Sequence, residues 1–149
     1  MSGGEKVLLV DAMLGKLTRF LRILGYNTLY VRDESDNEIL DKLAKTPDAI
    51  LITGDKDLFI TACKRGFNAC YIDSNMEIAM QLRKLREMGI IEIKFNAERT
   101  RCPICNEKLV LKAIEGSKIL WVCRKCNKEY WIGKHWKNIS KTLQVAKNE

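Results

Sequence analysis

The sequence predicts an α/β domain with a mainly parallel sheet flanked by helices, followed by a small module built around paired cysteines. Short apolar runs alternate with amphipathic segments through most of the chain, and two Cys-x-x-Cys pairs then appear near its C-terminal end. Such alternation is typical of right-handed β-α-β units that place helices on both faces of a sheet. We place the boundary near residues 97–100, so that the predicted domains span residues 5–97 and 98–149.

Four apolar runs predict strands, and a segment with helical periodicity follows each of them. The first run ends at Asp11, after which leucines recur at spacings of three and four until Gly25 predicts the end of a helix. Asp36 is expected to cap the second helix, and Pro47 to close it. Two further glycines end the third and fourth helices. The predicted strands are 7–10, 28–31, 49–53 and 69–72, with a further strand expected at 90–95.

Positive charge is concentrated in the second part of the chain. The 149 residues carry a net charge of +7, with 14 Lys and Arg against 15 Asp and Glu up to Glu98, and 12 against 4 from Arg99 onward. A near-neutral domain followed by a basic module is typical of proteins that bind nucleic acid, although basic surfaces also serve solubility.

The sequence also bears on location. No apolar run is long enough to span a bilayer, and the first residues are too polar for a secretory signal. We therefore expect a cytoplasmic protein that does not bind membranes.

The most specific motif is the set of four cysteines Cys102, Cys105, Cys123 and Cys126, whose two pairs are 17 residues apart. This spacing predicts a structural zinc ribbon with four thiolate ligands, because each pair brings two thiolates to one cation. A redox disulfide pair and ordinary thiols are the alternatives. Cys63 and Cys70 are expected in the core of the first domain.

Acidic residues follow each predicted strand, where the carboxyl ends of parallel strands meet at one edge. We expect them to hold Mg²⁺ or Mn²⁺ and so to support hydrolysis of a phosphodiester. Taken singly, several of them could instead be helix caps. The acidic residues at this edge are Asp11, Asp33, Asp36, Asp55, Asp57 and Asp73.

Basic and aromatic residues are candidate contacts to RNA. Lys16, Arg19 and Arg22 lie away from the leucine stripe of the first helix, where they could hold phosphates or simply be solvated. In the zinc ribbon, aromatic and charged residues are interleaved as in a stacking surface, although some of the aromatic residues must pack around the metal. The candidates there are Arg101, Lys128, Trp131, Lys134, His135 and Trp136.

The whole chain resembles the family named after the C-terminal domain of the Mut-seven exonuclease. The resemblance is carried by DAMLGKLTRFLRILGY at 11–26, DNEIL at 36–40, ITGDKDL at 52–58, RCPICN at 101–106 and CNKEYWIGKHW at 126–136. It implies a PIN-like fold, RNase activity and divalent-metal ligands at Asp11, Asp36, Asp55 and Asp57. The family commonly has Arg where this chain has Gly54, and Ser where it has Lys134.

These observations together predict a metal-dependent endoribonuclease that binds RNA through its zinc ribbon. An RNA- or ribosome-binding adaptor with a degenerate acidic edge is the first alternative. A toxin-like nuclease held by an inhibitor protein is the second. Whether Asp33, Glu38 or Asp73 joins the metal site stays open, and so does a homodimer, which the resemblance allows.

Overall fold

Four parallel strands form the sheet of the N-terminal part, and the computed structural model describes residues 6–115, 118–131 and 134–148. The strand order is β2-β1-β3-β4, and all four predicted strands are confirmed. β1 leads to β2 on one side, and the chain then crosses back to place β3 on the other. The switch point of this open sheet therefore lies between β1 and β3. The strands are β1 (Val7–Asp11), β2 (Asn27–Val31), β3 (Ala49–Thr53) and β4 (Ala69–Tyr71).

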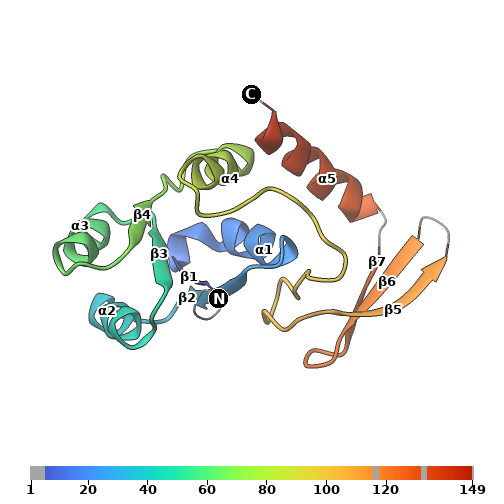
Figure 1. The fold of residues 1–149 in the computed structure, drawn as a ribbon, viewed down its shortest axis with the longest axis horizontal. Coiled ribbons are helices and arrows are strands. Elements are labelled where there is room, and N and C mark those ends of the chain that lie inside the picture. Colours follow the sequence, from blue (N-terminus) through green and yellow to red (C-terminus); the bar gives the residue numbers. More distant parts are fainter. Residues whose placement is uncertain (1–5, 116–117, 132–133, 149) are drawn as a thin grey trace.

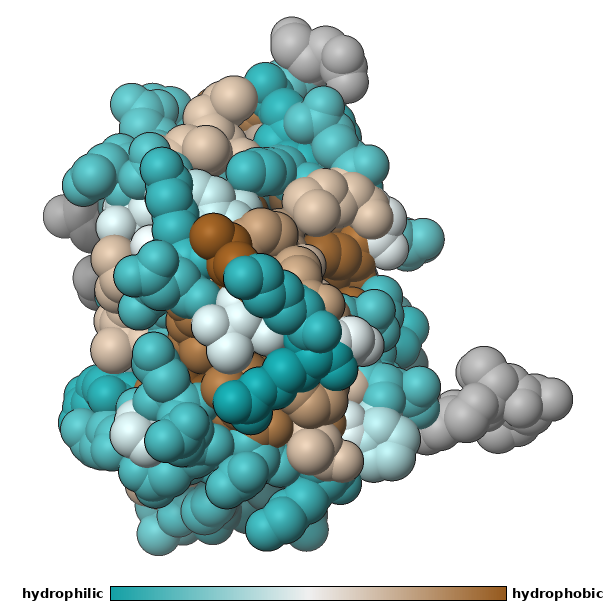
Figure 2. Space-filling view, turned by 90° about the vertical axis from the view of Figure 1, so that its left-hand side faces the viewer, coloured by the Kyte–Doolittle hydropathy of each residue, from teal (hydrophilic) through white to brown (hydrophobic). Residues whose placement is uncertain are grey.

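Helices cover both faces of this sheet (Figure 1), with α1 and α4 on one face and α2 and α3 on the other. Because successive strand side chains point to opposite faces, Leu8 and Val10 of β1 pack beneath α1, whereas Leu9 packs with α2 and α3. Hydrophilic side chains cover most of the end of the molecule where α2 and α3 lie (Figure 2). The helices are η1 (Ala12–Leu14, a 3-10 turn), α1 (Gly15–Ile23), α2 (Asp36–Lys45), α3 (Lys56–Lys64) and α4 (Ile78–Glu87).

The C-terminal part begins with a three-stranded antiparallel sheet in the order β5-β6-β7. Its strands are β5 (Val110–Glu115), β6 (Lys118–Cys123) and β7 (Lys128–Trp131). A register shift between Leu111 and Ala113 interrupts the pairing of β5 with β6. Trp121 of β6 lies opposite Tyr130 of β7, so that the two aromatic residues stand side by side. The predicted α/β fold with a parallel sheet flanked by helices, followed by a small module that holds the four cysteines, is confirmed.

A fifth helix, α5 (Lys134–Lys147), follows the small sheet and returns to the first part of the molecule (Figure 1). Leu143 and Ala146 are buried in the same apolar cluster as α1 and α4. Arg83 of α4 donates from Nε to the Ala146 carbonyl at 3.2 Å and from Nη2 to the Val145 carbonyl at 2.5 Å, which satisfies the last turn of α5. The sequence did not predict this helix, and the second part of the chain is therefore more than a cysteine module.

The strand expected at residues 90–95 is also wrong. This segment has no strand partner in the described part of the chain. Ile90, Ile91 and Ile93 are buried in the apolar cluster beside α1. Side chains, and not a neighbouring strand, form hydrogen bonds with main-chain groups of this segment. Lys6 Nζ donates to the Ile90 carbonyl at 2.8 Å, and the Glu92 N–H donates to Tyr26 Oη at 2.7 Å.

Candidate functional site

Asp11 lies at the switch point of the sheet, with 6% of its surface exposed. Its Oδ1 accepts a hydrogen bond from the Met13 N–H at 3.0 Å. Its Oδ2 accepts from the Gly54 N–H at 3.1 Å and from Thr53 Oγ1. Donors from both η1 and the end of β3 therefore fix this carboxylate in one orientation.

Thr53 is the residue that connects the two acids nearest the switch point. Its fully buried hydroxyl donates to Asp11 Oδ2 and accepts a hydrogen bond from the Asp55 N–H at 2.9 Å. Thr53 was not among the predicted site residues. The available signal is a hydroxyl residue that ends an apolar strand immediately before the acidic turn.

Asp55 caps α3, because its Oδ1 accepts from the N–H groups of Asp57 and Leu58 at 2.9 and 3.1 Å. Asp55 therefore does cap a helix, which was the alternative to metal binding, but it uses only one of its two carboxylate oxygens to do so. Asp57 is exposed in the first turn of the same helix.

Asp36 was expected to cap α2, and this is wrong because Ser35 is the capping residue. Ser35 Oγ accepts from the Glu38 N–H at 3.2 Å, and Glu38 Oε1 accepts from the Ser35 N–H at 3.1 Å. These hydrogen bonds to Ser35 lower the pKa of Glu38. Glu38 is therefore engaged in the capping box, which leaves exposed Asp36 as the acid in the first turn of α2 that serves no cap.

The acids lie along one edge of the sheet but are not drawn into one tight group. Neighbouring strands are about 4.8 Å apart, so acids that follow β2 and β3, on either side of β1, are separated by about two strand spacings. In the described part of the chain, no three carboxylates bring their oxygens within 4.8 Å of one another, and the four cysteines form the one such group of ligands. Asp73 lies at the β4 end, where its Oδ1 accepts from the Asn75 N–H at 2.9 Å.

The four cysteine sulfur atoms all lie within 4.8 Å of one another, and Cys105 Sγ is 3.4 Å from Cys123 Sγ. Tetrahedral zinc with Zn–S bonds of about 2.3 Å needs sulfur atoms about 3.8 Å apart, so the group fits zinc. Asn106 and Asn127, with φ of 73° and 59°, make the turn after each pair. Four protein ligands leave no open position, which fits a structural role.

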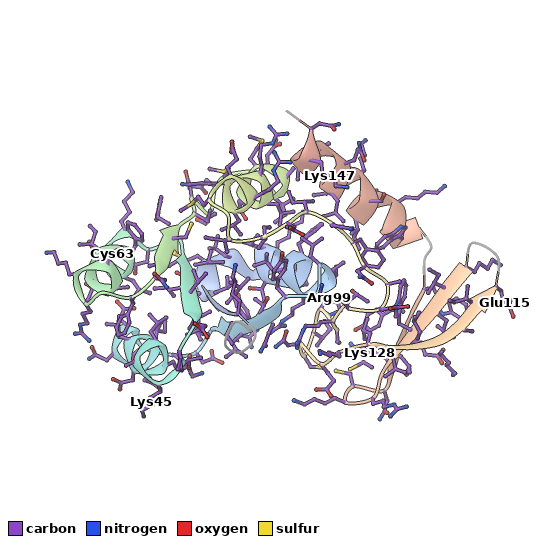
Figure 3. All side chains as sticks on the ribbon, in the orientation of Figure 1. Lys45, Cys63, Arg99, Glu115, Lys128 and Lys147 are labelled. Atoms are coloured by element: carbon purple, nitrogen blue, oxygen red, sulfur yellow. The ribbon has the colours of Figure 1, made fainter. Side chains whose placement is uncertain are left out.

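Tyr130 covers this cysteine group, with its Oη 3.2 Å from Cys102 Sγ. Burial raises the pKa of the Cys102 thiol, but hydrogen bonds from Tyr130 and from the Cys105 and Ile104 backbone outweigh burial and lower the pKa to about 7. The lowered pKa favours the thiolate, the form that binds metals. Cys63 lies at the far end of the molecule (Figure 3) and is exposed, so its expected place in the core is wrong, whereas Cys70 is buried as predicted.

Arg22 was expected to hold RNA phosphates or to be solvated, and both expectations are wrong because only 7% of its surface is exposed. Its Nη1 donates to the carbonyls of Pro103 and Ile104, at 3.0 and 3.1 Å, and its Nε donates to the Thr28 carbonyl at 3.0 Å. Burial lowers the pKa of Arg22, while the nearby Cys102 and Cys105 raise it in part. Arg22 therefore connects α1 to the first cysteine turn and is not available to RNA.

The other predicted RNA contacts differ in exposure. Lys16, Arg19 and Lys128 are exposed, as is Trp131, while Trp136 is partly buried against Phe95. Arg101 was expected to contact RNA, but it is buried and its Nη1 donates to the Asn106 carbonyl at 2.9 Å. The side chains of Lys134 and His135 lie outside the described residues.

A match to a known family accompanies this geometry. The model of the Mut7-C RNAse domain matches residues 6–143, nearly the whole chain. The chain belongs to the Mut7-C RNAse domain family. Membership in the Mut7-C family indicates a ribonuclease-like function with RNA as substrate. No curated protein and no solved structure matches the chain. No helix in the described ranges is long and apolar enough to cross a lipid bilayer.

Proposed function

We propose that this chain is a metal-dependent endoribonuclease whose acidic edge holds Mg²⁺ or Mn²⁺ and whose zinc ribbon helps to bind RNA. The observation that carries the proposal is the buried Asp11 carboxylate, held by Thr53 and Gly54 at the switch point of a sheet of the Mut7-C RNAse family. Open α/β sheets bind their ligands at this point.

The donor set fits a hard divalent cation, because it consists of carboxylate oxygens from three strand ends. We assign Asp11, Asp36, Asp55 and Asp57 as the ligands of one or two such cations at this edge. When bound, Mg²⁺ or Mn²⁺ supplies activation of water and stabilisation of the charge that develops in phosphodiester hydrolysis.

The residues of the chain orient this chemistry. Thr53 and Gly54 fix the Asp11 carboxylate, and the α3 cap holds Asp55 through one oxygen. Water then adds to phosphorus, the bond to one ribose oxygen breaks, and that oxygen gains a proton. The exposed Lys16 and Arg19 of α1 follow Asp11 closely in the chain and are proposed to bind the RNA phosphates that flank the cut bond.

The first test is cleavage of a mixed RNA pool by zinc-loaded protein, with and without added Mg²⁺ or Mn²⁺. Asp55→Asn is the informative variant, because asparagine also caps helices and the fold should be kept. Asp41→Asn is the matched control, since Asp41 is an exposed acid on α2 beyond the first turn. Metal-dependent cleavage that Asp55→Asn loses and Asp41→Asn keeps supports the proposal.

One observation favours a second function, that of an RNA- or ribosome-binding adaptor. Within the described residues the acids do not form a tight group, whereas the cysteines do. An adaptor would bind RNA with no cleavage under any metal condition, and Asp55→Asn would leave that binding unchanged.

A further inference from the structure

An apolar cleft of about 490 Å³ lies where the small sheet, α5 and the end of α1 meet. Five aromatic side chains contribute to its lining, and we call it the aromatic cleft. Phe95 contacts two of the others, with ring centroids 5.9 Å from Trp121 and 4.4 Å from Trp136. Trp131, at the end of β7, is 58% exposed. The five residues are Phe95, Trp121, Tyr130, Trp131 and Trp136.

Polar groups of the lining are already engaged within the protein. Trp121 Nε1 donates to the Ala97 carbonyl at 2.8 Å, and Thr100 Oγ1 donates to the Ile23 carbonyl at 2.7 Å. Glu129 is paired with Lys112 at 2.7 Å. The cleft therefore offers aromatic faces and few hydrogen-bonding groups, a surface that suits stacking of a flat ring without reading its edge.

A second groove lies along α5 and shares Trp136 with this cleft. Lys137 and Lys141, one helical turn apart, line this groove together with Ser140, Gln144 and Val145. No acidic residue is among the described residues that line it. A flat apolar ring in the cleft and negative charges along the two lysines together match one nucleotide and its neighbouring phosphates.

The cleft lies at the opposite edge of the sheet from the acids. Ile23, the last residue of α1, lines it, whereas Asp11 precedes η1 and α1. The nine residues of α1 span about 14 Å, and η1 adds about 6 Å. Figure 1 shows α1 extending from the β1 and β3 side of the sheet toward the small sheet. The cleft thus cannot contribute to the acidic edge directly.

We propose that the aromatic cleft holds one unpaired base of single-stranded RNA, with the RNA backbone along Lys137 and Lys141. The proposal rests on the proposed function insofar as RNA is the substrate. In this role the cleft binds the RNA at a distance from the bond that is cut, and it accepts any base.

The test is a binding measurement that needs no catalysis. Tryptophan fluorescence of the full zinc-loaded Asp55→Asn chain is titrated with a short oligoadenylate, and with an abasic ribose-phosphate chain of equal length. Stacking predicts quenching by the oligoadenylate and about five- to hundredfold weaker binding of the abasic chain. Trp131→Ala should lose the same factor, Trp131→Phe should retain most of the affinity, and Ile114→Ala, at an exposed apolar residue of β5, should change nothing.

Equal affinity for both chains, or unchanged affinity in Trp131→Ala, would overturn the proposal, as would an absence of quenching by any oligonucleotide. The two proposals fail separately. Base-dependent binding without cleavage by the wild-type chain would support base binding in the cleft and contradict the proposed nuclease activity. Cleavage without base-dependent binding would support the nuclease activity and contradict base binding in the cleft.

Discussion

Arg22 Nη1 lies 3.0 Å from the main-chain oxygen of Pro103 and donates a hydrogen bond to it. A charged side chain of α1 thereby holds the turn between two metal-ligating cysteines. On the same surface Asn106 accepts from the Thr28 N–H at 3.0 Å and donates to Asn27 at 2.7 Å. The turn between Cys102 and Cys105 is thus joined to the start of β2 and the end of α1, and the two parts of the chain should behave as one unit.

Replacement of Arg22 should destabilise the whole protein. Arg22→Ala removes the donor to three carbonyl groups in a buried place, and hydrogen bonds to charged groups contribute about 1.5–3 kcal/mol each without adding fully. We expect the free energy of unfolding in urea to fall by about 2–4 kcal/mol. Arg19→Ala, at an exposed position of the same helix, should change it by less than about 0.5 kcal/mol. Equal losses in the two variants would contradict a structural role for Arg22.

Loss of a zinc ligand should disturb the first domain as well as the ribbon. In Cys102→Ser we expect zinc content to fall and amide hydrogen exchange to rise in β6 and β7, and also at the start of β2, which contacts the first cysteine turn. Cys63→Ser is the control, because Cys63 is an exposed thiol on α3. Faster exchange confined to the ribbon would show that the two parts are independent.

Thr53 should act as a positioning residue for Asp11 and Asp55. Thr53→Val keeps the shape of the side chain but removes the hydroxyl that joins the two acids, and we expect a loss of about 1–3 kcal/mol in stability. Cleavage should lose kcat with little change in KM, and added Mn²⁺ should restore part of it. Thr61→Val on α3 serves as control. A wild-type kcat in Thr53→Val would contradict a positioning role for Thr53.

The remote cleft predicts a fixed spacing between the held base and the cut bond. The separation of about 20 Å from η1 and α1 corresponds to about six nucleotides at a stacked rise of 3.4 Å, and to fewer in an extended strand. An abasic residue moved along an end-labelled RNA should weaken cleavage at one spacing only, and Trp131→Ala should abolish this dependence. Cleavage that is insensitive to the abasic position would contradict the spacing.

Much of the fold could be predicted because its signals are local. Short apolar runs identify the four strands, and the Cys-x-x-Cys spacing identifies the four cysteines that lie together. The last helix escaped prediction because its stripe, Trp136, Ile139, Leu143 and Ala146, is set among lysines. The apolar residues at 90–95 are buried, but burial alone does not distinguish a strand from an extended loop.

The candidate site was predictable in position and less so in detail. Asp11 and Asp55 follow from the rule that parallel strands present their carboxyl ends at one edge. The role of Arg22 depends on a contact with residues about eighty positions away, which periodicity on α1 cannot reveal. The aromatic cleft likewise depends on how α5 packs against the segment at residues 90–95, so Phe95 and Trp121 were missed although Trp131 and Trp136 were named.

The central claim is that Asp11 and Asp55 hold the divalent cation that RNA cleavage requires. The most direct measurement follows Mn²⁺ binding by electron paramagnetic resonance and RNA cleavage in the same zinc-loaded samples of wild type, Asp55→Asn and Asp41→Asn. The account predicts that Asp55→Asn weakens Mn²⁺ binding and loses cleavage together, with Asp41→Asn like wild type. Cleavage that persists in Asp55→Asn with unchanged Mn²⁺ binding would contradict it.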